Sequence, residues 1–96
     1  MTSLRIEHPV SDFAAWKRTF DSYAERRQTG GVHSYQVLRL ADDPNFVLID
    51  LTFASRAAAE AFLDFLRGIW QSSAAGQVLS GAPQVRIAEL AESKQL

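Results

Sequence analysis

Hydrophobic and polar residues alternate in two stretches of the chain, residues 4–8 and 84–90, and this period of two is typical of strands with one buried face. Residues 35–40 and 46–53 are rich in β-branched, aromatic and aliphatic residues, which also favour strands. Residues 41–45 contain two aspartates, a proline and an asparagine, which favour a turn, so the two middle strands are expected to form a hairpin. The second strand of this hairpin is apolar on both faces except at Asp50 and Thr52, so protein must pack on both sides of it.

Two other stretches carry apolar residues every three or four positions, which is the spacing of one face of an amphipathic helix. These apolar residues are Phe13, Trp16, Phe20 and Tyr23 in the first stretch and Ala59, Phe62, Leu63, Leu66 and Ile69 in the second. One helix is expected over residues 12–28 and another from Ser55 to Trp70, with Asp12 and Ser55 placed to cap them. Residues 71–76 fit either a short helical turn or a loop, and residues 91–96 are expected to be a loose tail.

The resulting order βαββαβ predicts a single α+β domain over residues 1–96, with a four-stranded antiparallel sheet and two helices on one face. The strand positions expected to face the helices are Leu4, Ile6, Val47, Ile49, Leu51, Phe53, Val85 and Ile87. The opposite face mixes apolar groups with Arg5, Glu7, Asp50 and Arg86, which suits a wet or ligand-lined interface. A chain of 96 residues gains burial from a second copy, so we expect a homodimer whose paired sheets enclose a cavity near these charges.

Composition narrows the possible chemistry. A net charge of −1 without clustered basic residues argues against nucleic acid as a partner, and no apolar run is long enough to cross a membrane. The chain has no cysteine, and its two histidines, His8 and His33, have no closely spaced carboxylates, so neither a metal site nor a thiol nucleophile is expected. The N-terminus lacks a signal-peptide pattern, and the expected location is the cytoplasm.

Several segments resemble a known family. Residues 8–21 resemble the opening of small stand-alone members of the dimeric α/β-barrel superfamily, which includes the antibiotic biosynthesis monooxygenases. The other similar pieces are Arg26 and Arg27 before Gly30, the turn at residues 42–45, the alanine-rich second helix and the run 81–83 before the last strand. The resemblance implies a ferredoxin-like domain that pairs as a dimeric α/β barrel.

The same superfamily contains cofactor-independent oxygenases of aromatic polyketides, haem-degrading enzymes, isomerases, dehydratases and ligand sensors, so the fold leaves the activity open. Haem-degrading members use an Asn, a Trp and a His, but here no His follows Trp70 and no Asn lies in the first strand. These departures argue against haem. In the oxygenases that work without a cofactor, the substrate reacts as a carbanion and the protein supplies a base and a dry pocket, and this sequence has candidates for those roles but no diagnostic set of residues.

His8 matches the family's histidine and is the candidate base, although it could instead bond to Asp12 or to a backbone carbonyl. Asp12 itself is interpreted as a helix cap in preference to a catalytic acid. Trp16 fits core packing, and it could also line a pocket beside His8, because residues 12 and 16 share the helix face that meets the end of the first strand.

Four further residues are candidates for substrate binding: Tyr35, Asp50, Arg86 and Arg26. Tyr35 could reach the cavity as a phenol donor. Arg26 or its neighbour Arg27 could hold an anionic substrate group or simply occupy the last helical turn, where positive charge is favourable. Asp50 either pairs with Arg5 or Arg86 or has a raised pKa.

These observations predict a homodimer that binds a small molecule and acts as a cofactor-independent monooxygenase on an aromatic or polyketide-like compound. The alternative is a non-catalytic ligand-binding or structural dimer module.

Overall fold

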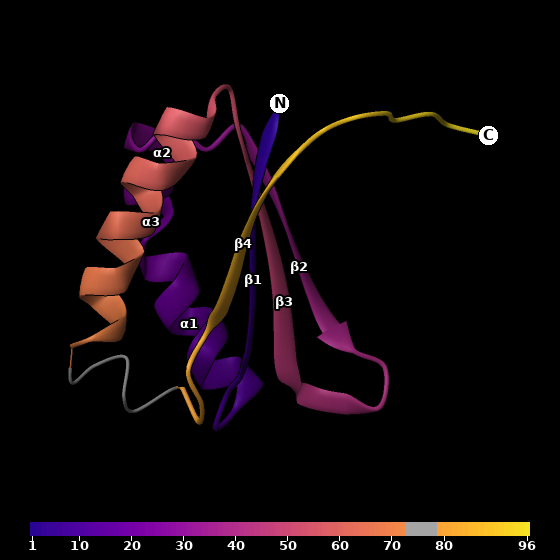
Figure 1. The fold of residues 1–96 in the computed structure, drawn as a ribbon. Coiled ribbons are helices and arrows are strands. Elements are labelled where there is room, and N and C mark those ends of the chain that lie inside the picture. The colour runs from indigo at the N-terminus through magenta and orange to yellow at the C-terminus, as the bar shows by residue number, and fades with distance from the viewer. Residues whose placement is uncertain (73–78) are drawn as a thin grey trace.

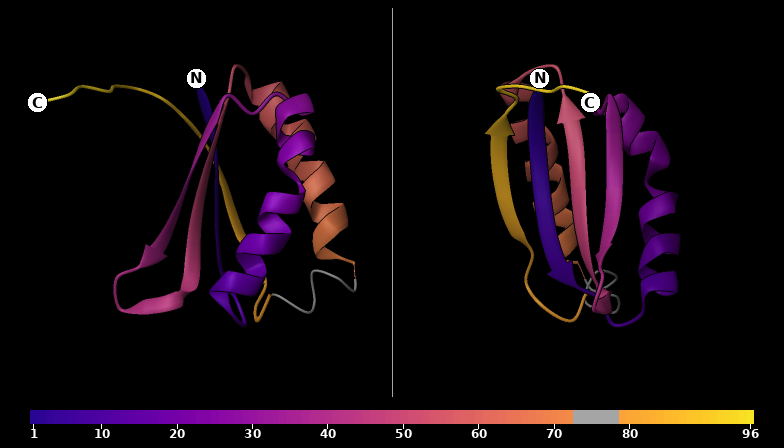
Figure 2. Two further views of the ribbon diagram at one scale, coloured as in Figure 1. Left: turned by 180° about the vertical axis from the view of Figure 1, so that it is seen from behind. Right: turned by 90° about the vertical axis from the view of Figure 1, so that its right-hand side faces the viewer.

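The computed structural model describes residues 1–72 and 79–96 and shows a four-stranded antiparallel sheet covered on one face by helices (Figure 1). The strands are β1 (Thr2–Pro9), β2 (Ser34–Leu40), β3 (Asp43–Phe53) and β4 (Gln84–Glu89), in the spatial order β2-β3-β1-β4. The helices are α1 (Phe13–Ser22), α2 (Ala24–Thr29) and α3 (Arg56–Trp70). The views in Figure 2 show that all three helices lie on the same side of the sheet. The predicted ferredoxin-like α+β arrangement is confirmed.

The core forms where the alternating strands meet the helices. Its buried members are Leu4, Ile6, Val10, Trp16, Val47, Ile49, Leu51, Phe53, Ala59, Phe62 and Leu63, and the β4 residues Val85 and Ile87 pack against them. The face assignment made from the alternation of strand residues is therefore confirmed for β1, β3 and β4, the three strands that it covered. Burial of these apolar side chains is the main force that holds the helices on the sheet.

The single helix expected over residues 12–28 is wrong, because the chain breaks at Tyr23 into α1 and α2. Tyr23 has φ −100° and ψ 16°, outside the helical region, and its N–H bonds to the Phe20 carbonyl at 3.2 Å. The hydroxyl of Ser22 donates to the Thr19 carbonyl at 2.6 Å, a local bond that competes with the regular helical ladder. The expectation of two helices thus becomes three.

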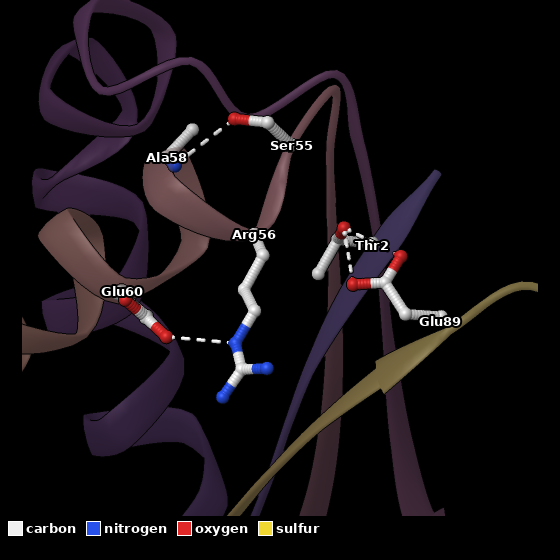
Figure 3. Close-up of polar contacts among 6 residues, drawn as sticks. All are labelled: Thr2, Ser55, Arg56, Ala58, Glu60 and Glu89. Carbon is white, nitrogen blue, oxygen red and sulfur yellow. Dashed lines mark hydrogen bonds and ion pairs between the residues drawn. The ribbon is translucent and has the colours of Figure 1, made fainter.

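The predicted caps are present at both long helices. The Asp12 carboxylate accepts from the Ala15 N–H at 2.9 Å, and the Ser55 hydroxyl accepts from the Ala58 N–H at 3.2 Å (Figure 3). After α2, Gly31 adopts a positive φ of 88°, which lets the chain turn into β2.

Two strands, β1 and β3, begin earlier in the chain than predicted. β1 begins at Thr2, whose hydroxyl bonds to the Glu89 carboxylate at 3.0 and 3.1 Å (Figure 3), and β3 begins at Asp43, which shortens the hairpin turn. Residues 91–96 have no helix or strand and are exposed. The open question of turn or loop at residues 71–76 falls, except for its first two residues, outside the described residues.

Candidate functional site

A cavity of about 80 Å³ lies between the sheet and the helices. Its lining consists of Ile6, His8, Trp16, Thr19, Phe20, Tyr23, Arg27, Ile49, Leu51, Phe62, Phe65, Leu66, Ile69, Trp70 and Leu79. Most of these side chains are aliphatic or aromatic, and the strongly polar groups among them are His8 and Arg27. An apolar lining with a few polar groups is the usual composition of a small-molecule pocket, and the volume of this cavity is below the roughly 300–1,000 Å³ of pockets for drug-sized ligands.

His8 is placed in the cavity by the alternation of β1, which directs residues 4, 6 and 8 toward the helices. Its side chain is only 2% exposed. Nδ1 lies 3.2 Å from the carbonyl oxygen of Pro9. When Nδ1 donates its proton to this oxygen, the neutral imidazole keeps its free lone pair on Nε2.

The electrostatic environment of His8 favours the neutral ring. Burial lowers the pKa of His8 below its ordinary value of 6.5, and the hydrogen bond to the Pro9 carbonyl opposes this effect only in part. A neutral imidazole near pH 7 can accept a proton, which is the property required of a general base.

Trp16 forms the wall beside His8. The cap at Asp12 starts α1 so that Trp16 points at the end of β1, and its indole ring meets the His8 imidazole edge-on with a centroid distance of 5.8 Å. The Phe20 ring continues this wall at 5.1 Å from the indole. The predicted proximity of Trp16 and His8 is therefore present, and Asp12 serves as the helix cap.

Arg27 lies at the other end of the same aromatic wall. Its side chain is buried, with 7% exposed, and its Cζ lies 3.8 Å from the Phe20 ring centroid and 4.9 Å from that of Tyr35. Nη1 donates to the Phe20 carbonyl at 2.6 Å, at the end of α1. The sequence analysis favoured Arg26 as a site residue, but the stripe of Trp16, Phe20 and Tyr23 continues by four residues to Arg27.

The remaining candidates lie outside this cavity. Tyr35 on β2 packs against Phe20 at 5.2 Å but is 44% exposed, so it borders the aromatic wall without lining the cavity. Arg26 stacks on Phe65 at 4.3 Å and lines a second pocket, of about 220 Å³, between α2 and α3.

Asp50 and Arg86 lie on the opposite face of the sheet from His8. Arg5 pairs with Asp50 of β3 and with Arg86 of β4, and residues that pair across strands share a face. The Arg5 Nη2 to Asp50 Oδ2 distance is 3.5 Å. The structure therefore does not bring His8 together with Asp50 and Arg86, because strand alternation separates residue 8 from residue 5.

Two further observations concern metal binding and membrane spans among the described residues. Residues 1–72 and 79–96 contain no group of three histidine, cysteine or acidic side chains that could hold a metal ion. In the same part of the chain, no helix has the length and apolar character needed to cross a membrane.

The sequence analysis missed the contribution of α3 to the cavity. Phe65, Leu66, Ile69 and Trp70 line it, although the helical pattern had assigned this face to general core packing. The available signal was Trp70 at the end of the apolar stripe, since tryptophan contributes a large apolar surface together with one N–H donor.

No family model and no curated protein matches the sequence. Among solved structures, a protein of unknown function from Nitrosomonas europaea has a TM-score of 0.76 at 19% identity, with 99% of this chain and 93% of that chain covered. SnoaB, a cofactor-independent oxygenase from Streptomyces nogalater, has a TM-score of 0.76 at 14% identity, with 96% and 94% covered.

A third structure, described as a "putative antibiotic biosynthesis monooxygenase" from Caulobacter crescentus, has a TM-score of 0.73 at 18% identity, with 95% of this chain and 90% of that chain covered. These similarities extend over nearly the whole chain and agree with the resemblance found in the sequence. At such identities they establish the fold, while activity depends on the residues of the site. The chain has the ferredoxin-like α+β fold of the antibiotic biosynthesis monooxygenase-like proteins.

Proposed function

We propose that this protein is a cofactor-independent monooxygenase that acts on an aromatic, polyketide-like compound bound between the helices and the sheet. The observation that carries the proposal is the buried His8, whose Nδ1 is held by the Pro9 carbonyl inside an apolar, aromatic cavity. The fold shared with SnoaB, an oxygenase that works without a cofactor, supports the same reaction class.

The chemistry needs a substrate with an acidic C–H bond between aromatic rings or beside a carbonyl group. His8 Nε2 takes a proton from the substrate CH₂ group, and the carbanion adds to molecular oxygen to form a peroxide anion. The imidazolium returns its proton to give a hydroperoxide, which loses water and leaves a ketone. The CH₂ carbon is oxidised, one oxygen atom enters the product and the other leaves as water.

The apolar wall has two roles in this reaction. Trp16 and Phe20 provide flat surfaces against which an aromatic substrate stacks, and they exclude water from the carbanion. Exclusion of water also keeps His8 neutral, because the charged imidazolium is poorly solvated there. Tyr35 borders this wall through Phe20 and can restrict the end of the cavity near β2.

We also propose that the chain works as a homodimer that pairs through the sheet face without helices. Arg5, Asp50 and Arg86 lie side by side on that face, and Asp50 Oδ1 is buried without a hydrogen-bond partner among the described residues. A second copy can supply the missing partner. In this arrangement Asp50 and Arg86 lie in the dimer interface, while His8 acts as the base in the cavity.

Oxygen consumption with anthrone tests the enzyme proposal, since anthrone has an acidic CH₂ group between two aromatic rings and gives anthraquinone and water. The wild-type protein should accelerate this conversion, and His8→Gln should lower kcat/KM by about 10²-fold or more, the range expected for a general base. His33→Gln is the matched control, because His33 is exposed and outside the cavity.

An equal rate for wild type and His8→Gln would remove His8 from the mechanism. Saturable binding of aromatic compounds without any oxygen consumption would favour the alternative of a ligand-binding module. The apolar character of the cavity is the observation on which that second function rests.

A further inference from the structure

Arg27 carries a charge that the described part of the chain does not neutralise. The residue is 7% exposed, yet none of the ion pairs among residues 1–72 and 79–96 includes it. A guanidinium group buried without a counter-ion loses much of its hydration without recovering it from an opposite charge. Such a group is a strong candidate for binding an anion supplied from outside.

The contacts of Arg27 leave hydrogen-bonding capacity free. Its hydrogen bond to protein uses Nη1, which donates to the Phe20 carbonyl at 2.6 Å. The rings of Phe20 and Tyr35 attract the positive charge but accept no conventional hydrogen bond. Because a guanidinium has five N–H donors, most of them are available to a bound group.

The free N–H donors of Arg27 belong to a side chain that lines the cavity. Arg27 lines the same cavity as His8, and the rings of Trp16 and Phe20, whose planes are tilted by 30°, lie between the two side chains. A flat molecule that lies along these rings meets the imidazole at one end and the guanidinium at the other. Arginine pairs especially well with planar oxyanions, to which it can donate two parallel hydrogen bonds.

We propose that Arg27 binds an anionic oxygen group, a carboxylate or an ionised phenol, at one end of a flat aromatic ligand and so selects acidic aromatic compounds. This inference rests on the proposed function for the identity of the cavity as the substrate site. It assigns to Arg27 a role beyond closing the end of α1, and it predicts that neutral aromatic compounds, anthrone included, bind more weakly than acidic ones of the same shape.

The test compares 2-naphthoate with 2-naphthamide, which have the same ring system but differ in charge. The chain contains two tryptophans, Trp16 and Trp70, and both line the cavity, so their indole N–H signals in ¹H–¹⁵N NMR spectra report binding directly. Wild type should bind the naphthoate about tenfold or more tightly than the amide, the preference expected for one charge-assisted pair.

Arg27→Met should abolish this preference while the affinity for the amide changes by less than about threefold, since methionine keeps the apolar stem. Arg27→Lys should keep part of the preference, because it retains the charge but not the two-point geometry. Arg26→Met is the matched control: it makes the same charge change on α2 at a residue that does not line the cavity, and it should keep the full preference.

Equal affinity of wild type for the two probes, or undetectable binding of the naphthoate, would overturn the inference, as would an Arg27→Met variant that still prefers the anion. A purely structural role would lower the melting temperature of Arg27→Met and Arg27→Lys but would leave the anion preference unchanged. These outcomes are distinct from failure of the proposed function, because binding is measured without oxygen consumption or turnover.

Discussion

The imidazole ring of His8 lies edge-on to the indole ring of Trp16, with ring centroids 5.8 Å apart and ring planes inclined at 65°. This contact joins the end of β1 to the first turns of α1. The indole covers the imidazole on the side of the helix and excludes water from it. The same contact therefore fixes the orientation of the proposed base and contributes to the burial that lowers its pKa.

The pH dependence of turnover follows from this burial. In the proposed reaction only neutral His8 can accept a proton, so kcat/KM for anthrone should rise with pH and reach half its maximum below the ordinary histidine value of 6.5. Trp16→Leu should admit water and move this midpoint upward, toward 6.5. Oxygen consumption across the acidic and neutral range measures both midpoints. A wild-type midpoint at or above 6.5 would contradict the assignment of His8 as the base.

Protein stability should respond to pH through the same residue. The unfolded chain takes up a proton on His8 near pH 6.5, whereas burial lowers the pKa in the folded chain. The unfolded state thus binds more protons between these two values, so this contribution is fully present above 6.5 and is lost as the pH falls toward the folded value. Urea unfolding at a series of pH values measures the loss.

His8→Gln should make the free energy of unfolding less dependent on pH in this window, because glutamine does not titrate. His33→Gln is the control for removal of an exposed histidine. If wild type and His8→Gln lost stability in parallel on acidification, His8 would not be the group responsible.

Much of this fold could be predicted from sequence because the decisive pattern is strong. Side chains alternate between the two faces along a strand such as residues 46–53, and this identifies the buried face. The spacing of Phe13, Trp16 and Phe20 identifies the helix face that packs on it. The break at Tyr23 could not be predicted in this way. It depends on side-chain hydrogen bonds of Ser22 and Arg27 to carbonyl groups of α1. Such bonds do not change the spacing of apolar residues from which the helix was predicted.

The candidate site was only partly predictable. The proximity of His8 and Trp16 follows from where β1 ends and α1 begins, and both positions are visible in the sequence. His8, Asp50 and Arg86 were all candidate site residues, but they cannot line one cavity within a chain, since His8 shares a face with Ile6 and Asp50 shares the opposite face with Arg5. Whether Arg27 has a counter-ion depends on three-dimensional contacts, which the sequence does not show.

The cap of α3 offers a direct test of a local interaction. Ser55 Oγ accepts from the Ala58 N–H, one of the first-turn donors that has no partner within the helix (Figure 3). Ser55→Ala should lower the free energy of unfolding by about 1 kcal/mol, the usual cost of losing an N-cap. Denaturant unfolding measures the change, and Ser55→Asp should restore most of the stability because aspartate also caps. Equal losses in the two variants would show that the hydroxyl acts in another way.

The sheet face opposite the helices provides the last prediction. Asp50 Oδ2 lies 3.5 Å from Arg5 Nη2, but Oδ1 is buried without a hydrogen-bond partner among the described residues. A buried charged oxygen of this kind is costly in an isolated chain, so in the proposed dimer we expect a donor from the second copy to bind it. Asp50→Ala should then raise the dissociation constant of the dimer by about tenfold or more, since a hydrogen bond to a charged group contributes roughly 1.5–3 kcal/mol.

Sedimentation velocity over a range of protein concentrations measures this constant. Asp64→Ala is the matched control, because it removes the same charge from α3, where the Asp64 side chain is 81% exposed and pairs only loosely with Arg67 at 4.0 Å. The control should dimerise like wild type. If Asp50→Ala also dimerised like wild type, the partner of Oδ1 would not come from a second copy, and a monomeric wild type would refute the paired sheets altogether. Neither result would affect the cavity, because His8 and Arg27 lie on the helix side of the sheet within one chain.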